Sequence, residues 1–313
     1  MNVFGNNFRV ALYGESHGPE VGVLLDGVPP GILLSEADFM EDIARRKSGA
    51  TGTTKRRETD EPLIKSGVYR NYTSGSPLCI TFMNRDARSR DYLLSDESDA
   101  AQKIPFRPGT ADYTGDVKFK GFQDPRGSGH FSGRLTLPLV AAGVVAKKIL
   151  ANKYPSTGIH AYLSQVGGIP VIKDRPLPEK VNTILRDSVE KGDSLGAVIS
   201  CEVNGVPAGV GNPFFDSLES LLSHAVFAIP GIKGITFGLG FDESLLTGSQ
   251  NPHIGGIAGG ITNGDPVSFQ IAVKPTPTVG GRGRHDACFA LRVPVVVEAV
   301  TAIVLADLSM TPA

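Results

Sequence analysis

The chain has 313 residues, of which 41% are hydrophobic and 20% are charged, so it can bury a sizeable core. Its formal net charge of -1 argues against general nucleic-acid binding but is compatible with a local basic pocket. The three cysteines lie far apart and lack zinc-ligand spacing, so we predict no metal site and reduced thiols. We see no signal-peptide pattern and no apolar run of membrane-spanning length, and we expect a cytoplasmic protein without a membrane partner.

The N-terminal part of the chain predicts a strand, a turn, a helix and two more strands. Residues 21–25 have strand character, and the glycines and prolines of 27–31 turn the chain. Ser35 is a predicted N-cap with Asp38 as its capping-box partner, which favours a helix to about Arg46. Two strands joined at 74–76 are expected within 64–84.

Two polar stretches in this part contain candidate functional residues. The glycines of GESHG, residues 14–18, indicate a sharp loop that presents His17, whose imidazole can transfer a proton near pH 7. A plain turn histidine explains the same pattern equally well. Residues 47–60, KSGATGTTKRRETD, are polar and basic; we favour a mobile, solvated segment, with an anion-gathering lid as the alternative.

Residues 107–136 are the most informative stretch: RPGTADYTGDVKFKGFQDPRGSGHFSGRLT. They are too polar for a core strand and too rich in glycine for a helix, so we predict a loop. Glycine lets backbone approach a ligand closely, and Arg107, Arg126 and Arg134 stay charged. A helix predicted at 137–153 would point its positive N-terminal end at the same place. An anion site is therefore favoured over a polar surface loop.

The second half predicts strands and helices in alternation. The order of strand, Gly-Val-Pro-x-Gly turn and helix seen at 21–46 recurs at 197–227, which hints at internal duplication. His224 falls on an apolar helical pattern and is expected to be a core histidine. The other predicted elements are a strand and turn at 160–171, a helix at 179–191, a strand at 267–273 and a buried helix from Pro294.

Three motifs near the C-terminus add candidate ligand contacts. Paired glycines at 253–264 suggest backbone packed on a flat ligand, or else a compact turn. KPTPT at 274–278 places one ammonium and two hydroxyls at a strand end. RGRHD at 282–286 ends in Asp286, which is either a structural turn residue or a general base. With His17, His130 and His285, these residues predict a site for an anionic, phosphorylated small molecule.

Seven motifs, in order and over nearly the whole chain, resemble the chorismate synthase family. They are FGNNFRVALYGESHG at 4–18, DGVPPGI at 26–32, ARRKSG at 44–49, RPGTADYTGDVKF at 107–119, GGIAGGITNG at 255–264, KPTPT at 274–278 and RGRHD at 282–286.

The resemblance implies an α/β fold in which antiparallel β-sheets sandwich a helical core with an internal pseudo-two-fold repeat. It implies one domain over residues 1–313, assembled as a homotetramer. The family's enzymes are lyases that convert 5-enolpyruvylshikimate 3-phosphate to chorismate and phosphate by anti-1,4-elimination. This last step of the shikimate pathway uses reduced FMN, with NADPH as a candidate reductant, and the cofactor supplies the hard chemistry.

The resemblance also assigns roles to residues of this chain. It implies catalytic roles for Ser16, His17 and Asp286, and substrate-anion binding by Arg46, Arg107 and Arg134. The flavin contacts that we expect are His130, Ser132, Gly259, Lys274, Pro275, Thr276, Pro277, Thr278 and Arg284.

The chain departs from the family pattern in two places. Thr110 stands where the family has a histidine that donates a proton, and threonine cannot titrate near neutrality. In the glycine loop the chain has GHFSGRLT where GRSSARET is usual, so that His130 replaces an arginine. We hypothesise that His130 is catalytic and takes over the acid role missing at Thr110.

Two other functions remain as alternatives. The chain could be a flavin or phosphate binder that lost its chemistry at Thr110. It could also be a phosphate-ester hydrolase built on His285 and Asp286, which would need a metal cluster that the sequence lacks.

Overall fold

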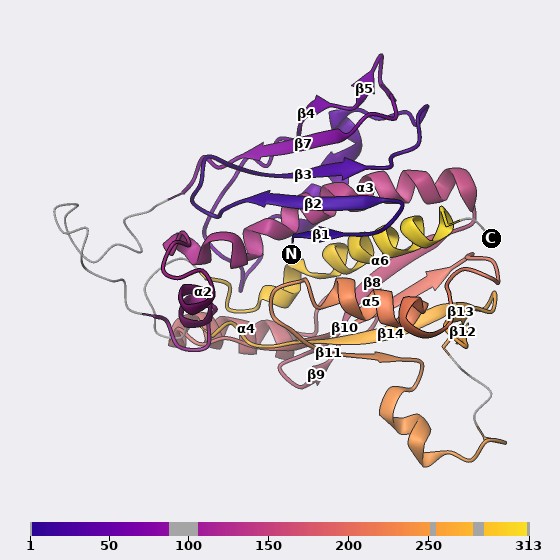
Figure 1. Ribbon diagram of the computed structural model, residues 1–313. Helices are drawn as coiled ribbons and strands as arrows, with labels where there is room; N and C mark the ends of the chain where they lie inside the picture. The colour runs from indigo at the N-terminus through magenta and orange to yellow at the C-terminus, as the bar shows by residue number, and fades with distance from the viewer. Residues whose placement is uncertain (1, 88–105, 251–254, 278–284, 312–313) are drawn as a thin grey trace.

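The computed structural model describes residues 2–87, 106–250, 255–277 and 285–311 (Figure 1). Two five-stranded antiparallel sheets enclose a layer of helices. The first sheet has the strand order β1-β2-β3-β7-β4. Its strands are β1 (Val3–Phe4), β2 (Arg9–Gly14), β3 (Glu20–Asp26), β7 (Leu78–Met83) and β4 (Leu63–Ser66).

The second sheet has the order β11-β14-β10-β8-β9. Every pairing in it is antiparallel, and β10 and β14 pair along their length from Ala197 opposite Val273 to Val203 opposite Val267. Its strands are β11 (Ile232–Phe237), β14 (Val267–Val273), β10 (Ala197–Asn204), β8 (Gly158–Val166) and β9 (Ile169–Pro170).

Two long helices, α3 (Thr136–Lys153) and α6 (Pro294–Ser309), form the middle layer and run in the same direction (Figure 1). Both are apolar on nearly all sides, as expected of helices buried against a sheet and against each other. The stretch from Arg126 to Lys153 is apolar enough to cross a membrane by length and composition, but 78% of its most apolar window is buried, as in a soluble core helix. The smaller helices α1 (Met40–Arg46) and α5 (Leu218–Val226) pack on α3 and α6.

The two halves of the chain repeat one arrangement. The order β2, β3, α1, β7, α3 in the first half corresponds to β8, β10, α5, β14, α6 in the second. In each half the middle strand runs into a Gly-Val-Pro turn, at 27–31 and at 205–209. The predicted α/β sandwich with antiparallel sheets is therefore confirmed, and its two halves follow the predicted internal repeat.

The predicted elements of the second half are mostly confirmed, including α4 (Glu179–Lys191). The predicted bend at 74–76 forms and leads into β7. The prediction of only two strands is wrong, because a small hairpin of β5 (Val68–Tyr69) and β6 (Tyr72–Thr73) lies between β4 and β7. This hairpin turns at Arg70 and Asn71, both at positive φ, where the sequence has no glycine to mark a turn.

The expectation of loop throughout 107–136 is also wrong, because helix α2 (Asp112–Lys118) forms there. Its one glycine, Gly115, is buried, and a Cβ atom there would lie 2.2 Å from the side chain of Gln123. Gly115 therefore serves close packing and does not end the helix.

The closest approach of the two core helices depends on Gly143. A Cβ atom at this position would lie 2.3 Å from the Cβ of Ala299, which no real contact tolerates. We expect Gly143→Val to lower the free energy of unfolding by about 1–3 kcal/mol through overpacking. Denaturant unfolding measures this. Gly158→Ala, at a site with open space, is the control, and an equal effect of both substitutions would contradict the packing assignment.

Glu298 is the charged centre of the helical layer. It is nearly buried and accepts hydrogen bonds from both terminal nitrogens of Arg45, at 2.7 Å each, and from Lys147 at 3.3 Å. Burial alone would raise the pKa of Glu298, but hydrogen bonding to Arg45 and the charge of Lys147 together lower it below its ordinary value of 4.5.

A lowered carboxylate pKa links stability to acid pH. The contribution of Glu298 is fully present above pH 4.5 and is lost as the pH falls through its lower folded-state value. We expect Glu298→Gln to lower the free energy of unfolding by about 2–3 kcal/mol at pH 7. We also expect a shallower fall in stability below pH 4.5 in this variant than in the parent chain. Unfolding curves measured from pH 7 to pH 3 test this, and parallel curves for the two proteins would refute it.

Candidate active site

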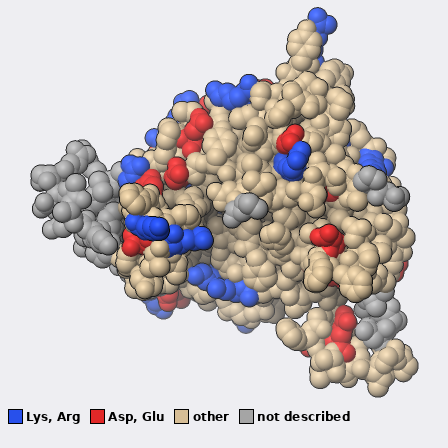
Figure 2. All heavy atoms as spheres, viewed as in Figure 1, with Lys and Arg blue, Asp and Glu red and all other residues tan. Residues whose placement is uncertain are grey.

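A cavity of about 1020 Å³ opens at the end of the helical layer where α3 begins. Its walls come from β2, residues 46–60, the loop before α3, the end of β14 and the residues before α6. Lysine and arginine side chains border a hollow on the face shown in Figure 2. Ordinary single-ligand pockets have volumes of about 300–1,000 Å³, so this cavity has room for two small molecules.

The loop that presents His17 is held by Arg56. One terminal nitrogen of Arg56 donates to Ser16 Oγ at 2.9 Å, and the other donates to the Ser16 carbonyl oxygen at 3.0 Å. The guanidinium is fixed in turn by Glu58 Oε1, at 2.7 and 3.0 Å. Arg56 belongs to the basic segment 47–60, in which Gly52 and Asp60 are buried. The interpretation of this segment as a solvated face is therefore wrong.

The glycine loop lies directly against His17. Gly127, Ser128 and Gly129 all have positive φ, at 57°, 69° and 51°. A Cβ atom on Gly127 would lie 2.3 Å from the imidazole of His17, so only glycine allows this approach. A hydrogen bond also joins the glycine loop to the loop of His17: the Ser16 N–H donates to the Gly129 carbonyl at 3.0 Å.

Two buried arginines form the inner wall. Arg46 is 4% exposed and donates to Thr136 Oγ1 and to the Gly133 carbonyl, both at 2.9 Å. Arg134 is 6% exposed and is paired with buried Asp60. Burial, followed by repulsion from Arg292, lowers the pKa of Arg46 to about 9. An anion bound beside Arg46 would reverse that shift.

Arg107 and Thr110, both in the RPGTAD segment, are joined by a hydrogen bond. Arg107 donates to both carboxylate oxygens of Asp112, at 2.7 and 2.8 Å, and to Ser128 Oγ at 2.9 Å. The Thr110 hydroxyl donates to the Arg107 carbonyl at 2.8 Å and accepts from the Asp112 N–H at 3.2 Å. Both residues line the cavity, and the Thr110 proton is engaged with the backbone.

Asp286 lies on the opposite wall, where it is fixed at both oxygens. Oδ1 accepts from the Thr54 N–H at 2.8 Å, and Oδ2 accepts from Arg292 at 2.6 Å. Arg292 also stacks on Phe289, with its guanidinium carbon 5.5 Å from the ring centroid. Asp286 is therefore held as an oriented carboxylate that faces the cavity.

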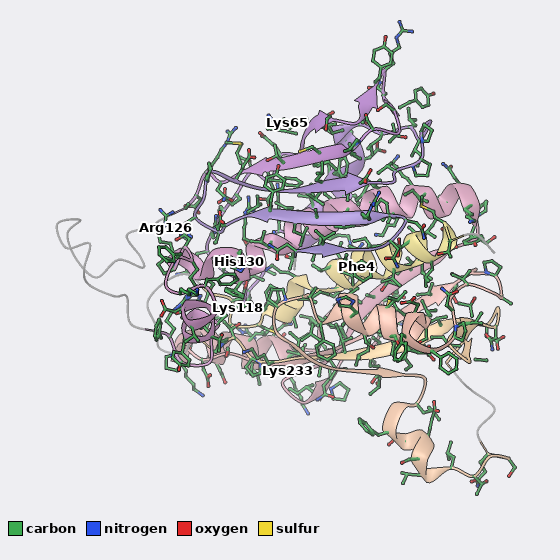
Figure 3. The ribbon with its side chains drawn as sticks, viewed as in Figure 1. Phe4, Lys65, Lys118, Arg126, His130 and Lys233 are labelled. Carbon is green, nitrogen blue, oxygen red and sulfur yellow. The ribbon has the colours of Figure 1, made fainter. Side chains whose placement is uncertain are left out.

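His130 lies in an aromatic corner at the rim (Figure 3). Its ring is 4.2 Å from that of Phe131 and meets the edge of Phe119 at 5.2 Å. Ser132, two residues on, accepts the Arg134 N–H at 3.2 Å and so begins the turn that leads into α3. Lys118 lines the same part of the cavity.

The segment 274–277 closes the cavity from the second sheet. Lys274 donates to the Gly109 carbonyl at 3.1 Å. The hydroxyl oxygen of Thr276 is buried and has no hydrogen-bond partner among the described residues. Pro275 and Pro277 line the cavity, whereas Gly259 does not and lies in the turn between β12 (Ile257–Ala258) and β13 (Ile261–Thr262). The predicted contacts Thr278 and Arg284 lie outside the described residues.

The sequence analysis did not identify three residues that line this cavity, and it assigned a fourth to the core. Arg56, Asp60 and Arg292 line the cavity, and their roles depend on partners distant in sequence, so no local pattern marks them. The prediction of His224 as a core histidine is wrong. His224 is exposed, lines the cavity and meets Phe4 edge-on at 5.3 Å.

Comparison with known proteins gives one consistent result. The family model described as "Chorismate synthase" matches residues 8–310. Chorismate synthase of Chitinophaga pinensis is 46% identical, over 98% of this chain and 96% of the relative. The Lachnospira eligens enzyme is 39% identical, over 98% and 94%. A crystal structure of chorismate synthase superposes with a TM-score of 0.76 at 28% identity, covering 97% of this chain and 92% of the other. The chain therefore belongs to the chorismate synthase family.

Proposed function

We propose that this chain is a lyase that converts 5-enolpyruvylshikimate 3-phosphate to chorismate and phosphate, the last step of the shikimate pathway towards the aromatic amino acids. In this elimination the ring carbon–oxygen bond to phosphate breaks, and a ring proton leaves from the opposite face. The observation that supports it best is a cavity in which cationic side chains adjoin two proton-transfer groups, His17 and Asp286.

Substrate binding follows from the charge of the cavity. The substrate has a phosphate and two carboxylates, and guanidinium groups match both kinds of anion in charge and in hydrogen-bond geometry. Arg46, Arg107 and Arg134 are the proposed anion ligands. Because each is held by other parts of the chain, these cations are positioned before the substrate arrives, which reduces the entropy cost of binding.

Proton transfer is assigned to His17 and Asp286. Asp286 is held as a carboxylate by Arg292 and the Thr54 N–H, and in this form it can accept a proton. His17 is the second proposed proton-transfer group. The Gly127 backbone and the Ser16 loop fix the position of its imidazole.

Departure of phosphate needs an acid, and His130 is the proposed one. The Thr110 hydroxyl donates to a backbone carbonyl within its own segment, and threonine does not titrate near neutrality. His130 lines the same cavity, and imidazole is the side chain that most often serves as a general acid in enzymes. We therefore assign to His130 the proton for the leaving phosphate.

Reduced FMN is the proposed cofactor, with NADPH as the candidate reductant. When bound, reduced flavin would supply transient electron density for the loss of phosphate, without net redox change. The residues present fit such a group: the buried hydroxyl of Thr276 lacks a partner among the described residues, and Lys274 adds an ammonium beside it. We propose His130, Ser132, residues 274–278 and Arg284 as its contacts. Gly259 does not line the cavity, so the contact expected there is withdrawn.

We also propose that the chain forms a single domain, assembles as a homotetramer and works in the cytoplasm. The single domain is supported by one hydrophobic cluster that includes both α3 and α6 and residues from both sheets. The assembly and the location rest on the family resemblance.

The activity is tested by anaerobic incubation of the chain with 5-enolpyruvylshikimate 3-phosphate and chemically reduced FMN. We expect chorismate and phosphate to appear in equal amounts, and only when reduced flavin is present. Chorismate absorbance and a phosphate assay measure the two products. Tight flavin binding without turnover would contradict the proposal and would favour a binding protein that lost its chemistry at Thr110.

The acid role of His130 is tested by His130→Ala. Loss of a general acid should lower kcat by about a hundredfold to ten-thousandfold. The dissociation constant for FMN, followed by flavin fluorescence, should change little, since His130 is one of many proposed contacts. His130→Phe, which keeps an aromatic ring against Phe119 and Phe131, should be as slow as the alanine variant. Full activity in either variant would rule out this assignment.

A further inference from the structure

Among the largely buried arginines of the cavity, Arg292 uses the fewest of its donors within the described part of the chain. A guanidinium has five N–H donors. Within the described part of the chain Arg292 makes one hydrogen bond, to Asp286, and its Nε is buried without a partner. Its side chain is only 12% exposed, and it lines the cavity. A buried cation with unmet donors is costly unless a ligand satisfies it.

The arginines predicted as anion ligands are better satisfied by the protein itself. Arg134 donates to Asn84, to Asp60 and to the Met83 carbonyl. Arg107 makes two hydrogen bonds with Asp112 and a third with Ser128. Among the largely buried arginines of the cavity, the unmet hydrogen-bonding capacity is therefore greatest at Arg292.

The charge around Arg292 points to a monoanion. Arg292 and Arg134 both repel the buried charge of Arg46, while Asp60 and Asp286 offset it. Arg134 is paired with Asp60 and Arg292 with Asp286, while among the described carboxylates Arg46 reaches only the shared Asp60, at 3.8 Å. These five groups together are left with one positive charge. A carboxylate would neutralise this group, whereas a phosphate dianion would leave an excess of negative charge.

We propose that Arg292 and Arg46 form a carboxylate subsite, in which Arg292 binds a carboxylate of the substrate while one of its terminal nitrogens holds Asp286. The inference rests on the proposed function for the identity of that substrate. It makes Arg292 a binding residue in its own right, and not only a positioning residue for Asp286.

The two roles are separated by a double-mutant cycle on substrate affinity. We expect Arg292→Gln to weaken binding of 5-enolpyruvylshikimate 3-phosphate by about tenfold to a hundredfold, measured by calorimetry with oxidised FMN so that no turnover occurs. In an Asp286→Asn background the same substitution should weaken binding by a similar factor. An effect of Arg292→Gln that disappears in that background would show that Arg292 acts only through Asp286, and would overturn the proposal.

Two further variants control for folding and for charge. Arg186→Gln removes an exposed arginine on α4 and should leave affinity unchanged. Arg292→Lys keeps the charge but loses the planar fork, so an intermediate loss is expected. It replaces Arg292→Gln in the cycle if thermal unfolding shows that the glutamine variant does not fold. Affinity equal to that of the parent chain in Arg292→Lys and Arg292→Gln alike would refute the subsite.

The subsite is also tested without the substrate, which separates it from the proposed function. Failure of the parent chain to bind 5-enolpyruvylshikimate 3-phosphate would count against that function. Pyruvate should still raise Tm in the parent chain, and this rise should be lost in Arg292→Gln. A rise caused by inorganic phosphate alone, or a pyruvate effect that survives in Arg292→Gln, would overturn the carboxylate assignment.

Discussion

The contact between α3 and α6 is the constraint on which the rest of the molecule depends. Both helices are apolar on nearly all sides, so neither is stable in water without a sheet above or below and the other helix beside it. Gly143 lets the two backbones approach closely enough for both sheets to cover them. Because the helices run in the same direction, their positive N-terminal ends lie on the same side of the molecule, where the cavity opens (Figure 1).

The cavity combines positive charge with very little freedom of movement. Three of its arginines are each anchored by a carboxylate: Arg56 by Glu58, Arg134 by Asp60 and Arg107 by Asp112. These carboxylates offset part of the positive charge of the cavity, but they also fix the direction in which the remaining N–H donors of the arginines point. Burial and repulsion from Arg292 lower the pKa of Arg46, and the anion that we propose to bind there would relieve this repulsion.

The sequence was informative where its signal was periodic or local. Helix α4 and strand β14 begin and end where hydrophobic periodicity predicts, and the capping box at Ser35 and Asp38 forms. Loop conformation was harder to predict, because Arg70 and Asn71 form a turn without glycine, and Gly115 lies within a helix. Seven motifs sufficed to indicate the family.

Pairings between residues far apart in the chain could not be predicted from the sequence. Arg134 and Asp60 are 74 positions apart, and only the finished fold brings them together. No local pattern marks Arg292, and His224 was predicted as a core residue, because a sequence pattern does not distinguish a cavity wall from a core. The most direct test of the whole account is a crystal structure with 5-enolpyruvylshikimate 3-phosphate and FMN. We predict substrate anions against Arg46 and Arg292, within reach of His17 and Asp286. Density for the substrate outside this cavity would contradict the account.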